Sequence, residues 1–143
     1  IGLVIEEIPP EELLRKRVGG VGSILYTLFH IVDVEYSWLC VLQGKPDPQE
    51  PAFEAYRSLQ KGRDLSRQVH EEVAVFIRSW TEEMEERKLV LTNPMGRPKP
   101  IITGNHATCI AHKIHHIGQL SVWAHKVGQE PVTANLINRG LFE

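Results

Sequence analysis

The sequence predicts an all-α protein, and three observations lead to this prediction. Long segments repeat apolar residues every three to four positions, helix-capping residues precede them, and glycines follow them. Extended structure is marginal, with one short candidate pair around residues 89–91 and 100–103. The 143 residues fit one domain that covers the whole chain, so we expect a single helical bundle over residues 1–143.

The first part of the chain predicts a short helix followed by a long apolar one. Residues 9–12, Pro-Pro-Glu-Glu, are typical of a helix start, because proline fits the first turn and acids favour the N-terminal dipole. Gly19 and Gly20 end this segment. Ser23 can cap the next helix, which ends at Gly44. Its apolar positions nearly encircle it, which predicts burial on most sides and favours a homodimer that supplies the extra neighbours.

Two further long helices are expected. Residues 53–86 show helical periodicity with charges between the apolar positions, which predicts a long amphipathic helix, bent near Gly62. Three prolines between residues 93 and 100 exclude a regular helix there. Asn105 can cap a last helix that continues to Val127 and stops at Gly128.

Charge and composition exclude several classes of protein. The formal net charge of -2 and the absence of a basic stripe argue against nucleic acid as a partner. We find no apolar run that approaches the roughly 20 residues of a membrane span, and residues 1–8 are too short and acidic for a signal peptide. Cys40 and Cys109 are too few for a disulfide scaffold. We therefore expect a soluble cytoplasmic protein with no membrane partner.

Histidine clustering is the most unusual feature of the sequence. Four of the seven histidines fall within residues 106–116. His112 and His116 are four residues apart, so their side chains lie about 40° apart on one helix face, where two imidazoles can chelate one ion. A pair of hydrogen-bonded histidines is the alternative interpretation. Gln119 shares this face, as does Cys109, which is interpreted as a small core residue.

A third metal ligand must come from another segment, and His30 is the leading candidate. It lies in a strongly apolar helix, where an unpaired imidazole is costly, although a hydrogen-bonded core histidine would also fit. Glu35 lies in the same run and needs a partner or a supporting role at the site. His115 is rotated about 100° around the helix from His116. It could be a supporting group beside the site, a base that faces the substrate, or a surface residue.

These segments together resemble the DinB-like (DinB/YfiT) metalloprotein superfamily. The resemblance rests on Ser23-Ile24, His30, Glu35 and Trp38-Leu39, and on the later string His112-x2-His115-His116-x-Gly118-Gln119-Leu120. It implies a four-helix bundle with up-down-down-up connectivity, often dimeric, with His30, His112 and His116 as metal ligands. The chain begins with Ile1, so we expect the first of those helices to be truncated. It departs from the family string at Ile117, often Arg, and at Thr108, often His, which puts the substrate in doubt.

Three imidazoles would leave coordination positions open to water, as in catalytic rather than structural metal sites. The resemblance implies a thiol-dependent S-transferase that joins a low-molecular-weight thiol to a small electrophilic substrate. A metal-dependent hydrolase, with His115 or Glu35 assisting proton transfer, and a non-catalytic metal-binding dimer are the alternatives. The divalent ion is expected to be zinc, nickel or another first-row transition metal, because imidazole suits several of them.

Overall fold

The computed structural model describes residues 6–46, 53–92, 98–102 and 107–130. Three helices of 19 or 20 residues form most of it: α3 (Ile24–Leu42), α4 (Leu59–Arg78) and α6 (Ala107–Lys126). The shorter elements are α2 (Pro10–Leu14), η1 (Phe53–Tyr56), α5 (Glu82–Glu85), β1 (Lys88–Thr92) and β2 (Pro98–Ile102). The expected all-α class is confirmed. The strand pair also forms where the sequence allowed one, antiparallel, with Lys88 opposite Ile102.

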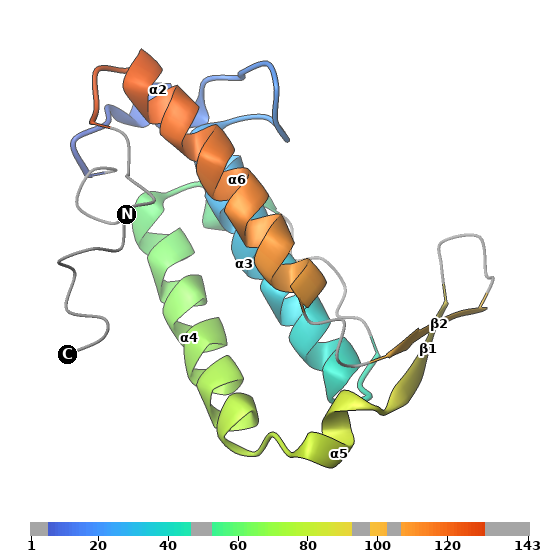
Figure 1. Cartoon of the computed structure of the whole chain (residues 1–143). Helices are drawn as coiled ribbons and strands as arrows, with labels where there is room; N and C mark the ends of the chain where they lie inside the picture. Colours follow the sequence, from blue (N-terminus) through green and yellow to red (C-terminus); the bar gives the residue numbers. More distant parts are fainter. Residues whose placement is uncertain (1–5, 47–52, 93–97, 103–106, 131–143) are drawn as a thin grey trace, which may run out of the picture.

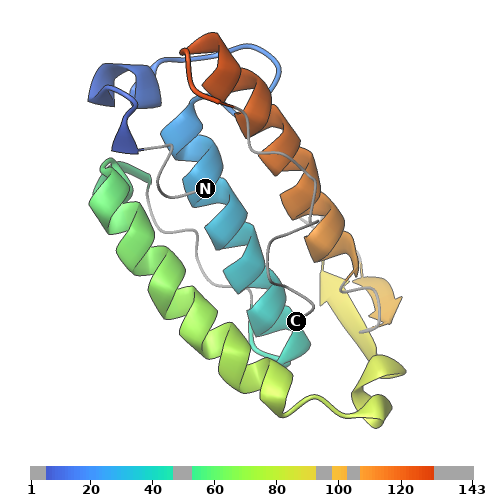
Figure 2. The same cartoon turned by 60° about the vertical axis from the view of Figure 1, so that its left-hand side comes forward.

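Helix α3 lies between α4 and α6 and packs against both (Figures 1 and 2). The colours of Figure 1 show that α3 and α4 run in the same direction and that α6 runs back. These three helices follow the down-down-up part of the expected connectivity. The short helix predicted from residues 9–12 is α2.

Hydroxyl side chains set the helix boundaries. Ser23 Oγ accepts a hydrogen bond from the Tyr26 backbone N–H at 3.1 Å and so caps α3, as predicted. Ser58 Oγ accepts from the Lys61 N–H at 3.3 Å in the same way. The prediction of one long helix over residues 53–86 is therefore wrong. Ser58 starts a new helix after η1, and α4 ends before Ser79, whose hydroxyl bonds back to the Phe76 carbonyl at 2.7 Å.

Helix α3 is less buried than predicted. Its two ends are buried, but residues 30–38 are only half-buried, although α4 and α6 pack against the helix. The helix also has the length and hydropathy of a membrane span, although no such run was expected. An apolar core helix meets the same criteria.

A buried apolar cluster lies at the end of the bundle where α2, the start of α3 and the end of α6 meet. Its members are Ile8, Leu13, Ile24, Leu25, Leu120 and Trp123. The loop before α3 crosses the Trp123 indole at Gly20. A Cβ atom on Gly20 would lie 2.4 Å from Trp123 Cη2 and 3.3 Å from Gln119 Oε1. This contact leaves no room for a side chain at Gly20, and it places the loop beside Gln119.

Candidate metal centre

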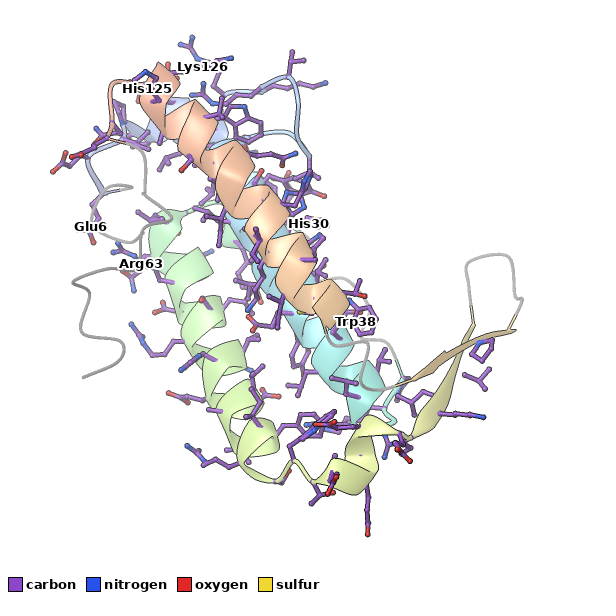
Figure 3. All side chains as sticks on the ribbon, in the orientation of Figure 1. Glu6, His30, Trp38, Arg63, His125 and Lys126 are labelled. Atoms are coloured by element: carbon purple, nitrogen blue, oxygen red, sulfur yellow. The ribbon has the colours of Figure 1, made fainter. Side chains whose placement is uncertain are left out.

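Three histidines from two helices meet at one point. His30 comes from the middle of α3, and His112 and His116 come from successive turns of α6 (Figure 3 labels His30). The Nε2 atoms of His112 and His30 are 3.2 Å apart, and those of His116 and His112 are 3.1 Å apart. One nitrogen from each of the three rings lies within 4.8 Å of the other two.

This spacing fits a metal ligand set. Zn–N bonds of about 2.0–2.1 Å in tetrahedral geometry place two ligand nitrogens roughly 3.3 Å apart, close to the two Nε2 separations. A ring nitrogen carries either one N–H or one lone pair. His112 Nε2 can therefore make one linear hydrogen bond at a time, although two neighbouring Nε2 atoms face it. The remaining lone pairs converge on a common space, as a bound cation requires.

Burial favours the neutral, metal-binding form of His112. Desolvation, followed by the charges of the nearby His116, His30 and His115, lowers the pKa of His112 from its usual 6.5. Its Nδ1 atom is buried and has no hydrogen-bond partner among the residues that the structure describes. His116 is 5% exposed. Protonating the His112 ring would place a cation next to two other imidazoles.

A second layer of side chains touches two of the three rings, His116 and His30. Gln119 Oε1 lies 2.8 Å from His116 Nδ1, and Gln119 Nε2 lies 3.0 Å from His115 Nε2. The Tyr26 ring stacks on His30, with centroids 6.4 Å apart and planes at 13°. Gln119 is thus in direct contact with the histidine cluster, and His115 is joined to it through Gln119.

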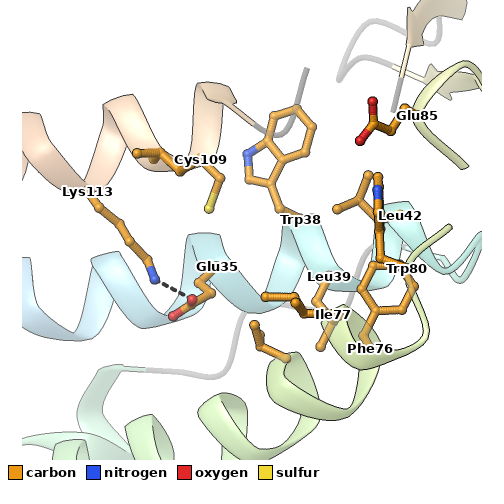
Figure 4. A pocket seen from close by; sticks show the side chains of 12 residues that line it. Glu35, Trp38, Leu39, Leu42, Phe76, Ile77, Trp80, Glu85, Cys109 and Lys113 are labelled. Atoms are coloured by element: carbon orange, nitrogen blue, oxygen red, sulfur yellow. Dashed lines mark hydrogen bonds and ion pairs between the residues drawn. The ribbon is translucent and has the colours of Figure 1, made fainter. Parts of the chain in front are cut away.

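Glu35 has a different environment from the three rings. Its carboxylate forms an ion pair with Lys113, which follows His112 on α6 (Figure 4). The sequence predicted that Glu35 needs a partner but did not single out Lys113. The available signal for this partner was the position of Lys113 directly after the candidate ligand His112.

A pocket of about 660 Å³ lies between α3, α4 and α6, and the Glu35–Lys113 pair is at its edge (Figure 4). Its walls are mainly apolar and include Trp38, Phe76 and Trp80. Cys109, one turn before His112, also lines it. Burial raises the pKa of the Cys109 thiol, so the thiol form is favoured. Cys109 is only half-buried and faces the pocket, so it is not the small core residue that the sequence suggested.

Comparisons with known proteins identify the family. A model of the DinB family matches residues 1–139. The chain belongs to the DinB family. It is 40% identical over 137 residues to the uncharacterized protein YizA of Bacillus subtilis (strain 168), a match that covers 94% of this chain and 84% of YizA. A crystal structure of a DinB-like protein, YjoA, from Bacillus subtilis superposes with a TM-score of 0.63 at 18% identity, covering 92% of this chain and 87% of that one. The latter match shows the fold alone.

Two further histidines of this DinB-family chain, His70 and His125, do not belong to the three-ring group. His125 is exposed near the end of α6 (Figure 3), and His70 is exposed on α4. Both were interpreted as solvated from their phase or their charged neighbours. His106 and the predicted cap Asn105 lie outside the described residues. The clustering of histidines in the sequence thus contains two members of the three-ring group, and the third comes from α3.

Proposed function

We propose that this protein is a divalent-metal-dependent enzyme whose ion is held by His30, His112 and His116. The observation that supports this proposal is the convergence of three ring nitrogens within 4.8 Å of one another, with His112 Nε2 at 3.1 and 3.2 Å from the Nε2 atoms of His116 and His30, close to the separation of ligands on one ion. Zinc, nickel and other first-row transition metals fit an imidazole set. Three protein ligands leave coordination positions for water or for a substrate atom.

The proposed reaction is the transfer of a low-molecular-weight thiol to a small electrophilic molecule. A bound divalent ion would lower the pKa of a thiol or of water, so that either can lose its proton near neutral pH. The sulfur then forms a bond to the electrophilic carbon, the leaving group departs with its electron pair, and the thiol proton passes to solvent. The pKa of His112 is lowered by desolvation and by its histidine neighbours, which favours the neutral ring that a metal ligand needs.

The metal site is tested first by metal content. Purified protein is loaded with Zn²⁺, dialysed and analysed by inductively coupled plasma mass spectrometry, alongside His30→Ala, His112→Ala and the control His125→Ala. We expect about one equivalent in the wild type and the control, and loss of most of it in the other two variants, since two imidazoles hold an ion weakly. Unchanged metal content in both site variants would contradict the proposed metal site.

The reaction type is tested with the loaded protein, a chromogenic electrophile and a panel of cellular thiols. The S-conjugate, detected by mass spectrometry, should form with the wild type and His125→Ala but not with His112→Ala. Turnover of an activated ester without any thiol would instead identify a hydrolase. Zinc binding with neither reaction would leave a metal-binding protein without catalysis.

We also propose that the protein works as a cytoplasmic homodimer on small molecules, without nucleic acid or membrane. The half-buried middle of α3 and the exposed Ile110, Ile114 and Val122 on α6 support a partner copy. Light scattering at two protein concentrations measures the mass, and a value near 16.3 kDa at both would contradict the dimer.

A further inference from the structure

The Gln119 amide connects His116 to His115. Its Oε1 lies 2.8 Å from His116 Nδ1, while the other ring nitrogen of His116, Nε2, lies 3.1 Å from His112 Nε2. An amide oxygen only accepts hydrogen bonds, so His116 Nδ1 must carry the proton. The Nε2 atom of His116 then has a free lone pair that points at the cluster.

The opposite orientation of the amide gives the opposite result. With its NH₂ group facing His116, Gln119 would donate to Nδ1, and the proton of His116 would then sit on Nε2, between the other two rings. That tautomer has no lone pair to offer an ion. The state of His116 therefore depends on which end of the amide faces it.

His115 and Gly20 restrict that amide. Gln119 Nε2 lies 3.0 Å from His115 Nε2, and it donates to that atom when the proton of the neutral His115 ring is on Nδ1. In that arrangement the NH₂ group lies on the side away from His116. On another side lies Gly20, where an added Cβ would lie 3.3 Å from Gln119 Oε1. His115 is exposed and belongs to the turn that precedes Gln119. The Gln119 amide is thus hydrogen-bonded to His116 through Oε1 and to His115 through Nε2, and the Gly20 loop lies beside it.

We propose that Gln119 is a positioning residue that holds His116 as its Nδ1–H tautomer, so that the Nε2 lone pair is available to a metal ion, and that His115 selects the orientation of the amide. The consequence for metal binding rests on the proposed function. The tautomer itself does not, because it is a property of the protein without metal. Outer groups of this kind typically change metal affinity by about 10–100-fold.

The first test measures the tautomer without metal. Long-range ¹H–¹⁵N correlation spectra of metal-free protein, at a pH where the ring is neutral, distinguish Nδ1–H from Nε2–H histidine. His116 should show the Nδ1–H pattern in the wild type and should lose it in Gln119→Leu. A wild-type Nε2–H pattern, or an unchanged pattern in Gln119→Leu, would overturn the inference whether or not the protein binds zinc.

The second test measures Zn²⁺ affinity by competition with a chromophoric chelator. Gln119→Leu should bind about 10–100-fold more weakly than the wild type. Gln119→Glu keeps an acceptor for Nδ1–H and should stay within a few-fold of it. Gln68→Leu, at an exposed glutamine on α4, is the matched control. Equal losses in Gln119→Glu and Gln119→Leu would indicate a role in packing only and would contradict the inference.

A third variant covers the case in which Gln119→Leu does not fold. His115→Ala removes an exposed side chain and leaves the amide free to turn, so we expect about 10-fold weaker zinc binding and a mixture of His116 tautomers. His125→Ala should change neither. Wild-type affinity in His115→Ala would show that His115 does not select the orientation. If the wild type itself fails to bind zinc while His116 keeps its Nδ1–H pattern, the proposed function fails and the tautomer assignment stands.

Discussion

The partly buried ring of His112 makes the stability of the protein depend on pH. Burial and its histidine neighbours lower the pKa of His112 in the folded protein. In the unfolded chain the same ring is solvated and has its ordinary pKa. As pH falls, the unfolded chain therefore binds this proton first, and protons bound preferentially by the unfolded state destabilise the folded one.

We predict that the unfolding free energy of the metal-free protein decreases as the pH is lowered from about 8 to about 5.5. The loss begins near the ordinary histidine pKa and levels off below the lowered folded pKa. Urea denaturation at a series of pH values measures it. His112→Ala should remove part of the pH dependence, whereas His125→Ala should keep it. A full pH dependence in His112→Ala would contradict the assignment to this ring.

The sequence reveals the residues of the site unequally. His112 and His116 follow from spacing, because four residues make about one helical turn. His30 needed the family resemblance, since no local pattern tells which face of α3 meets α6. Lys113 and Tyr26 were not singled out, because their contacts with Glu35 and His30 form only once the helices are docked. Local chemistry identifies candidates, and tertiary packing selects among them.

At the scale of elements, the loop before α3 is held against α6 by a contact that requires glycine. Gly20 and the buried Trp123 meet so closely that a methyl group would lie 2.4 Å from the rigid indole. The same loop borders Gln119. An added side chain at Gly20 must therefore move either the loop or the indole, and the displacement would reach the second layer of the histidine cluster.

We predict that Gly20→Ala destabilises the protein by about 1–3 kcal/mol, the usual cost of overpacking a well-filled site. Gly62 is the matched control, because it lies inside α4 and a methyl group added there would meet nothing within 4 Å among the described residues. Gly62→Ala should stabilise the protein by up to about 1 kcal/mol through helix propensity. Thermal or urea unfolding measures both. Equal effects of the two substitutions would show that the contact with Trp123 is unimportant.

Element boundaries were predictable where a cap is local. Ser23 and Gly44 bounded α3 correctly, and Gly128, with φ of +81°, follows α6 as expected. The helix over residues 53–86 was predicted too long, because apolar spacing continues through the breaks at Ser58 and Ser79. Periodicity records which face is apolar, and it does not record where the backbone changes direction.

At the scale of the whole molecule, the proposed ion would connect the central helix to the last one. His30 belongs to α3, and the other two ligands belong to α6. An ion that binds only this arrangement stabilises the folded state over the unfolded one. Metal binding and the docking of these two helices are therefore coupled.

We predict that Zn²⁺ stabilises the wild type by about 2.7 kcal/mol when free zinc is about 100 times the dissociation constant. A chelator should reverse this gain. His30→Ala should show little of it, because two histidines on one helix do not link α6 to α3. Urea unfolding with zinc or with EDTA provides the comparison. An equal gain in His30→Ala would place the ion elsewhere.

The two sides of the cluster are far apart along the chain. His30 and His112 are separated by 82 positions, yet their Nε2 atoms lie 3.2 Å apart. During synthesis, the first ligand leaves the ribosome long before its partners exist. The complete centre can form only after the last long helix has been made and has returned to α3. Occupancy of the centre would thus report that α6 has docked on α3, and a fragment that lacks α6 would not form the three-histidine centre.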